Sequence, residues 1–296
     1  MKTPVFTGAS TAIVTPYRKD LVDYEKLGQL IDLQVNGGIS AITICGTTGE
    51  SSTQTLDEHM KTVDFCVKHV AGRVKVIAGS GSNDTRAALQ LSKSAAASGA
   101  DALLSVTPYY NKASQKGLIE HFTYIADRVN VPIILYNVPS RTSCGFTAKT
   151  YKTLSEHPMI NGVKEASGNF SLIAETRSLC GDNLNIWSGN DEQTVPLISL
   201  GGKGLISVTA NIIPDKISQM CSLALAGDFE GASRIQFETI ALTNSLFLEV
   251  NPIPVKTAMN LIGLDVGDLR LPLCNMDESN LVKLRQALVN YGFDVK

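Results

Sequence analysis

Short apolar runs rich in β-branched residues recur about every thirty residues along most of the chain, which is the length of one strand-helix unit. Patterns of amphipathic helices lie between these runs, and no hairpin signal interrupts the repeat. We therefore expect all the strands to pair in parallel. Eight runs fit the spacing, at residues 12–14, 41–45, 74–78, 102–106, 131–136, 160–164, 184–187 and 205–208.

Parallel strand-helix units form either a closed (β/α)₈ barrel or an open doubly wound sheet, and the number eight favours closure. Four further helices are predicted without strands between them, at residues 215–226, 228–249, 255–264 and 278–291. The first of them completes the barrel. The sequence thus predicts an α/β fold, with a (β/α)₈ TIM barrel over residues 1–226 and a C-terminal helical extension over 227–296 packed on the barrel.

Composition limits the kinds of binding partner and the cellular compartment that we expect. A formal net charge of −2 provides no basic surface for nucleic acid. No run of about eighteen apolar residues predicts a membrane span, and the first residues lack the apolar core of a signal peptide. The six cysteines are dispersed without a C-x-x-C pair, as expected of reduced thiols. We expect a cytoplasmic protein with no membrane or nucleic-acid partner.

Metal and cofactor motifs are missing from the sequence. The four histidines fall in predicted helices or at helix ends, and there is no H-E-x-x-H. A G-x-S-x-G elbow and a full G-x-G-x-x-G are also absent, which disfavours serine hydrolase and dinucleotide chemistry. The expected cofactor is none, and the expected metal is none.

The active site of this fold lies at the carboxyl ends of the strands, and Lys164 ends the sixth predicted strand. Burial there disfavours the charged ammonium and exposes a neutral amine, the nucleophile of Schiff-base chemistry with a carbonyl substrate. A structural lysine that reaches the surface or pairs with Glu165 would leave the same local pattern. The neighbouring strand ends must decide between these readings.

Two other strand ends carry three complementary groups. Residues 46–49, Gly-Thr-Thr-Gly, offer hydroxyls and backbone N–H groups that suit a carboxylate, although an ordinary capped turn has the same composition. Tyr136, on the strand next to Lys164, is a candidate proton carrier or a buried structural tyrosine. Arg141 is a candidate for a bidentate contact with a substrate carboxylate, or else an exposed loop residue.

Four segments together resemble one family. They occur in order and without a large gap: Gly46-Thr47-Thr48-Gly49-Glu50-Ser51, Tyr136-Asn137-Val138-Pro139-Ser140-Arg141-Thr142, Val163-Lys164-Glu165-Ala166-Ser167-Gly168-Asn169 and Asn251-Pro252-Ile253-Pro254-Val255-Lys256. The chain is similar to the dihydrodipicolinate synthases, within the pyruvate-dependent class I aldolases. The second and fourth segments favour a synthase over an N-acetylneuraminate lyase or a 2-keto-3-deoxy-acid aldolase.

The resemblance implies a lyase that condenses pyruvate with L-aspartate 4-semialdehyde through a Schiff base on Lys164. The product would be 4-hydroxy-tetrahydrodipicolinate, formed in the first committed step of the diaminopimelate route to lysine. Thr48 and nearby backbone N–H groups would hold the pyruvate carboxylate. Gly189 and Ile206 would line the pyruvate site through backbone atoms.

The resemblance also implies a proton relay of Tyr136, Thr47 and Tyr110, with Tyr110 donated by a neighbouring subunit. Arg141 would orient the relay and bind the carboxylate of the semialdehyde. A homo-oligomer is therefore expected, either a dimer or a dimer of dimers (a homotetramer). Two other functions remain open: a pyruvate aldolase acting on a sugar acid, and a catalytically silent barrel in which Lys164 is inert.

Feedback by L-lysine is the point at which the sequence departs from the family pattern. Ser51, His59, Asn83 and Tyr109 match the regulatory site of lysine-inhibited relatives. A histidine and a glutamate of that site are replaced here by Leu56 and Ala87.

We predict weak or absent inhibition by L-lysine, because the carboxylate that would pair with the ligand's ammonium is missing. Initial rates measured against increasing L-lysine check this. An inhibition constant in the sub-millimolar range would contradict it.

Overall fold

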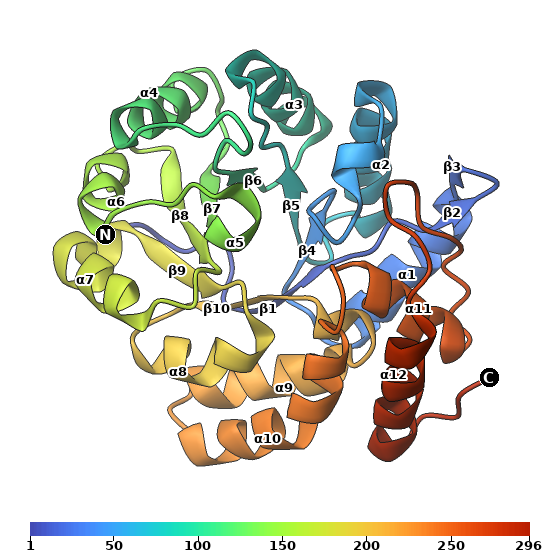
Figure 1. Cartoon of the computed structure of the whole chain (residues 1–296). Coiled ribbons are helices and arrows are strands. Elements are labelled where there is room, and N and C mark those ends of the chain that lie inside the picture. The colour runs from blue at the N-terminus through green and yellow to red at the C-terminus, as the bar shows by residue number, and fades with distance from the viewer.

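The barrel strands consist of apolar and small residues, and nearly all their side chains are buried, as expected where helices cover the outer face of a parallel sheet. The computed structural model describes residues 1–296 and shows a closed barrel of eight parallel strands with helices around it (Figure 1). β1 pairs with both β4 and β10, which closes the ring. The predicted (β/α)₈ barrel is confirmed. Its strands are β1 (Gly8–Ala12), β4 (Ala41–Ile44), β5 (Lys75–Gly79), β6 (Ala102–Val106), β7 (Ile133–Asn137), β8 (Ile160–Glu165), β9 (Asn185–Ser188) and β10 (Gly204–Ser207).

Most helices of the barrel begin at a residue whose side chain caps the helix. Asp23 accepts a hydrogen bond from the backbone N–H of Lys26, and Thr55 forms a capping box with Glu58. These helices are α1 (Tyr24–Asn36), α2 (Leu56–Val70), α3 (Thr85–Ser98), α4 (Gln115–Ala126), α5 (Pro139–Thr142), α6 (Ala148–Ser155), α7 (Phe170–Cys180), α8 (Thr194–Ser199) and α9 (Pro214–Leu225).

Two features near the N-terminus differ from the sequence prediction. The first strand covers Gly8–Ala12 instead of residues 12–14, because small and hydroxyl residues replace the apolar residues expected of a strand. A short antiparallel hairpin, β2 (Tyr17–Arg18) and β3 (Leu21–Val22), then follows. Its turn residues Lys19 and Asp20 have φ of 52° and 63°, a conformation that Asn-Gly usually signals, so the hairpin left no recognisable motif.

The barrel interior is a packed core and not a channel. Phe6 stacks on Trp187 with ring centroids 5.1 Å apart, and Trp187 donates its indole N–H to the carbonyl of Phe6 over 3.3 Å. These residues form one buried apolar cluster with Ile77, Tyr136 and Ile206. The open space of the site therefore lies at the carboxyl ends of the strands, above this cluster.

The C-terminal extension consists of α10 (Phe229–Ser245), α11 (Ile253–Leu261) and α12 (Glu278–Tyr291), close to the three predicted helices. α10 packs beside α9, and α12 packs against α10 and α11 (Figure 1). Ala232 and Leu284 of the extension belong to the same apolar cluster as Ala9 of β1, so one core spans both parts of the chain. The domain boundary after residue 226 stays a prediction. No helix combines the length and the apolar character needed to cross a membrane.

His121 on α4 gives the fold a testable dependence on pH. Burial lowers the pKa of His121 from 6.5 to about 4, and its Nε2 has no hydrogen-bond partner, while Nδ1 lies 2.9 Å from the Thr85 hydroxyl. Between pH 6.5 and about 4, His121 therefore binds a proton in the unfolded chain but stays neutral in the folded protein. Stability is lost as the pH falls from 6.5 towards 4.

We predict that His121→Gln loses less stability than the wild type over this interval, by about 3 kcal/mol. Urea unfolding at a series of pH values measures the difference. Equal acid losses in the two proteins would contradict the prediction.

Candidate active site

Lys164 and Tyr136 meet at the carboxyl ends of adjacent strands. Side chains alternate along β8, so Val163 and Glu165 face the outer helices while Lys164 faces the barrel interior. Lys164 is the register partner of Tyr136 on β7, and its Nζ lies 4.6 Å from the centroid of the tyrosine ring. The lysine is only 5% exposed. The structure thus brings together the candidate nucleophile and the candidate proton carrier.

A buried hydrogen-bond network on the outer side of β7 and β8 fixes the register of the two strands next to Lys164 and Tyr136. Glu165 accepts hydrogen bonds from the Tyr151 hydroxyl at 2.8 Å and from Asn137 Nδ2 at 2.9 Å and 3.1 Å. Burial and the Glu165 carboxylate hold the pKa of Tyr151 well above its ordinary value, so Tyr151 stays a donor. Because Asn137 directly follows Tyr136 and Glu165 directly follows Lys164, the network joins β7 to β8 next to these two candidate residues.

Gly189 leaves room for the lysine. A Cβ at this position would lie 2.6 Å from Ala166 Cβ and 3.1 Å from Lys164 Cε, so a side chain there would overlap Ala166 and crowd the lysine chain. The Gly189 N–H donates to the carbonyl of Glu165 over 2.8 Å, which fixes the close approach. Ile206 on β10 lies in the inner apolar cluster together with Tyr136. Both predicted pyruvate-site positions therefore lie at the barrel interior.

Thr48 and Arg141 are connected through one residue of the C-terminal extension. Asn251 donates its side-chain Nδ2 to the Thr48 hydroxyl over 3.0 Å. Its backbone carbonyl accepts a hydrogen bond from Arg141 Nη2 over 3.1 Å. The candidate carboxylate-binding threonine and the candidate second-substrate arginine thus share an anchor, although they follow different strands.

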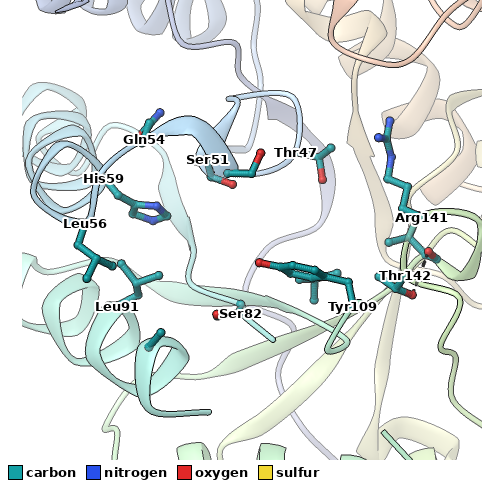
Figure 2. A pocket seen from close by; sticks show the side chains of 15 residues that line it. Thr47, Ser51, Gln54, Leu56, His59, Ser82, Leu91, Tyr109, Arg141 and Thr142 are labelled. Atoms are coloured by element: carbon teal, nitrogen blue, oxygen red, sulfur yellow. Dashed lines mark hydrogen bonds between the residues drawn. The ribbon is translucent and has the colours of Figure 1, made fainter. Parts of the chain in front are cut away.

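A pocket of about 380 Å³ opens beside these residues and is lined by Thr47 and Arg141. A smaller cavity of about 50 Å³ shares Thr47 and reaches Tyr136. Figure 2 shows Thr47 and Arg141 on one side of the larger pocket, with His59 and Leu56 on the other. Lys164 lines neither of these two spaces, but Tyr136, whose ring lies next to the lysine, lines the smaller one.

The residues predicted for regulation divide between this pocket and the surface. Ser51, His59 and Tyr109 line the larger pocket, whereas Asn83 does not. Leu56 and Ala87 line the same pocket and give it an apolar wall (Figure 2 labels Leu56). His59 Nε2 lies 2.7 Å from the carbonyl of Gly79, and burial lowers the pKa of His59, so the ring is neutral near pH 7.

Tyr110 is the one predicted relay residue that a single chain does not bring to the site. It is 91% exposed, and it lines neither cavity. Its φ of 69° places it in a left-handed turn after β6. Its role stays a prediction.

Sequence reasoning missed the buried charges behind the threonines. Glu50 and Lys256 form an ion pair with Nζ and Oε1 2.8 Å apart, and both side chains are inaccessible to solvent. Lys256 is the only charged residue of the otherwise largely apolar helix α11, and this was the one signal in the sequence that it is buried and paired. No periodic pattern connects it to Glu50, which lies more than two hundred positions earlier.

Comparison with known proteins decides the family. The model of the dihydrodipicolinate synthetase family matches residues 5–290. The chain belongs to this family. The 4-hydroxy-tetrahydrodipicolinate synthase of Thermoanaerobacter sp. (strain X514) is 54% identical over 290 residues, covering 98% of this chain and 98% of that relative. This family member is accordingly a lyase of amino-acid biosynthesis.

Solved structures agree with the sequence comparison. Dihydrodipicolinate synthase from Aquifex aeolicus superposes with a TM-score of 0.96 at 44% identity, covering 98% of this chain and 100% of that one. The chloride-inhibited enzyme from Acinetobacter baumannii, complexed with pyruvate, gives a TM-score of 0.94 at 41% identity, covering 97% and 99%. The barrel and the extension therefore match these relatives over nearly their whole length.

Proposed function

We propose that this family member condenses pyruvate with L-aspartate 4-semialdehyde through an imine on Lys164. One observation carries the proposal: a buried lysine at the carboxyl end of a barrel strand has a tyrosine ring 4.6 Å from its Nζ. Such a lysine can attack a ketone, and such a tyrosine can move protons to and from the intermediate. The pyruvate complex of the A. baumannii relative supports the choice of ketone.

The first half of the reaction activates pyruvate. Lys164 Nζ attacks the keto carbon, and the resulting carbinolamine loses water to form the imine. Loss of a proton from the methyl group then gives an enamine. Thr48 and neighbouring backbone N–H groups bind the carboxylate, and Gly189 and Ile206 line the site through their backbones. The anchored Thr48 hydroxyl, which already accepts from Asn251, is free to donate its proton to this carboxylate.

The second half joins the two substrates and releases the enzyme. The enamine carbon attacks the aldehyde carbon, and the aldehyde oxygen takes up a proton to become the hydroxyl of the product. The amine of the semialdehyde then attacks the imine carbon and displaces Lys164, which closes the ring of 4-hydroxy-tetrahydrodipicolinate. One water is released overall, and the free amine of the lysine is regenerated without a cofactor.

Proton transfer and recognition of the second substrate involve four further residues. Tyr136, Thr47 and Tyr110 form the relay, with Tyr110 supplied by a second copy of the chain, so a dimer is the minimum active unit. Arg141 binds the semialdehyde carboxylate. The guanidinium fork suits a carboxylate, and the hydrogen bond to the carbonyl of Asn251 orients it at the pocket.

We predict that borohydride with pyruvate traps a covalent adduct on the wild-type protein and none on Lys164→Ala, because Lys164 presents its buried amine to the barrel interior beside Tyr136, whereas the amine of Lys256, the other buried lysine, is ion-paired with Glu50. Intact-protein mass spectrometry measures the adduct. Lys203→Ala is the matched control, since Lys203 precedes β10 at the opposite end of the barrel, and it should trap like the wild type. Absence of an adduct on the wild type would contradict the proposed chemistry.

We predict that Arg141→Ala lowers kcat/KM for the semialdehyde by roughly 100-fold while pyruvate trapping persists. A charge-assisted contact to one substrate carboxylate contributes about 1.5–3 kcal/mol, which corresponds to a loss of this order. Arg128→Ala removes an arginine that stacks on Tyr124 away from the pocket, and it should leave the kinetics unchanged. If the wild type turned over a sugar-acid aldehyde and not the semialdehyde, the assigned second substrate would be wrong and the protein would be a sugar-acid aldolase.

A further inference from the structure

Glu50 and Lys256 are two charges removed from solvent behind the loop that carries Thr47 and Thr48. Their side chains are 0% and 1% exposed. Glu50 Oε1 accepts from Lys256 Nζ at 2.8 Å, and Oε2 accepts from the backbone N–H of Arg270 at 3.0 Å. Lys256 Nζ also donates to the carbonyls of Thr15 and Asp268, at 3.2 Å and 2.5 Å. Both charges are therefore fully hydrogen-bonded.

Glu50 ends the loop in an unfavourable backbone conformation. Its φ of 53° is left-handed, a conformation that costs about 1 kcal/mol or more for a residue with a side chain. The backbone N–H of Glu50 donates to the carbonyl of Thr47 at 3.0 Å, so the turn is continuous with the threonine. Holding the Glu50 carboxylate in place consequently holds Thr47 and Thr48.

The C-terminal extension contacts this loop at three points. Asn251 reaches Thr48, Lys256 reaches Glu50, and Arg270 donates its backbone N–H to Glu50. The Arg270 guanidinium also donates to both carboxylate oxygens of Glu58 on α2, at 2.7 Å and 3.1 Å. The loop that follows β4 is thus held by the extension through both its threonine and its glutamate.

We propose that Glu50 and Lys256 are positioning residues for pyruvate: their buried ion pair sets the place of Thr47 and Thr48 relative to Lys164. The proposal rests on the function proposed above for the two threonines. It makes the C-terminal extension part of the substrate site, although the extension adds no residue that touches the reacting atoms. A pair that served stability alone would leave the affinity for pyruvate unchanged when it is neutralised.

Glu50→Gln is the principal test, because it keeps the shape of the side chain and leaves Lys256 two backbone carbonyl acceptors. We expect the pyruvate concentration for half-maximal borohydride trapping, and the KM for pyruvate, to rise about tenfold, since small displacements of binding groups cost this much or more. Trapping at saturating pyruvate should still reach completion. The KM for the semialdehyde should change by less than about twofold.

A double variant, Glu50→Gln with Lys256→Met, removes both charges and avoids the buried unpaired charge of either single loss. We expect a higher Tm than for Lys256→Met alone, with half-saturation for pyruvate still raised. A gain in stability without a gain in pyruvate affinity is the result expected if the ion pair positions Thr47 and Thr48. Lys216→Met is the control, because it breaks a partly exposed pair with Glu238 at 3.4 Å on the outer helices. It should behave as the wild type.

Wild-type half-saturation for pyruvate in Glu50→Gln, at any Tm, would overturn the proposal. Failure of both Glu50 variants to fold would also overturn it, because the pair would then be a requirement of folding. Failure of the proposed function is distinguishable, since it appears in the wild type as a lack of any pyruvate adduct.

Discussion

Closure of the barrel is the constraint on which the rest of the structure depends. β1 must pair with β10 on one side and β4 on the other, and its residues are small, Gly-Ala-Ser-Thr-Ala. A Cβ on Gly204 would lie 1.8 Å from the carbonyl oxygen of Gly8, so the seam requires glycine there. Once the ring closes, the carboxyl ends of all eight strands surround one space. Groups such as Thr48 and Arg141, distant in sequence, then reach a common anchor in Asn251.

The alternation of side chains lets one short strand serve both structure and chemistry. On β8, Lys164 faces the interior while Glu165 faces the helices and gathers donors from Tyr151 and Asn137. The buried carboxylate is expensive to desolvate, and the hydrogen bonds that satisfy it also fix the register between β7 and β8. The outer network thereby keeps Tyr136 level with the lysine, a relation that a purely apolar outer face would specify less strictly.

Sequence reasoning recovered the features that depend on local pattern. The spacing of apolar runs predicted the closed barrel, and the order of strands predicted that Tyr136 and Lys164 would be neighbours, as the register shows. It misplaced β1, whose small residues look unlike a strand, and it missed the β2–β3 hairpin, whose Lys19-Asp20 turn lacks glycine. The contacts of the extension were not predictable, because Glu50 and Lys256 are joined only by the folded chain.

The use of charge at that contact is itself informative. A buried ion pair gains little net stability over apolar side chains of the same volume, because desolvation of both groups offsets their attraction. An apolar pair at positions 50 and 256 would pack the extension onto the barrel, yet it would tolerate sliding and rotation of the loop. The Glu50 carboxylate instead meets two donors in fixed directions, one of which is a backbone N–H. Directional bonds of this kind specify where the loop lies, which the proposed pyruvate site beside Lys164 requires.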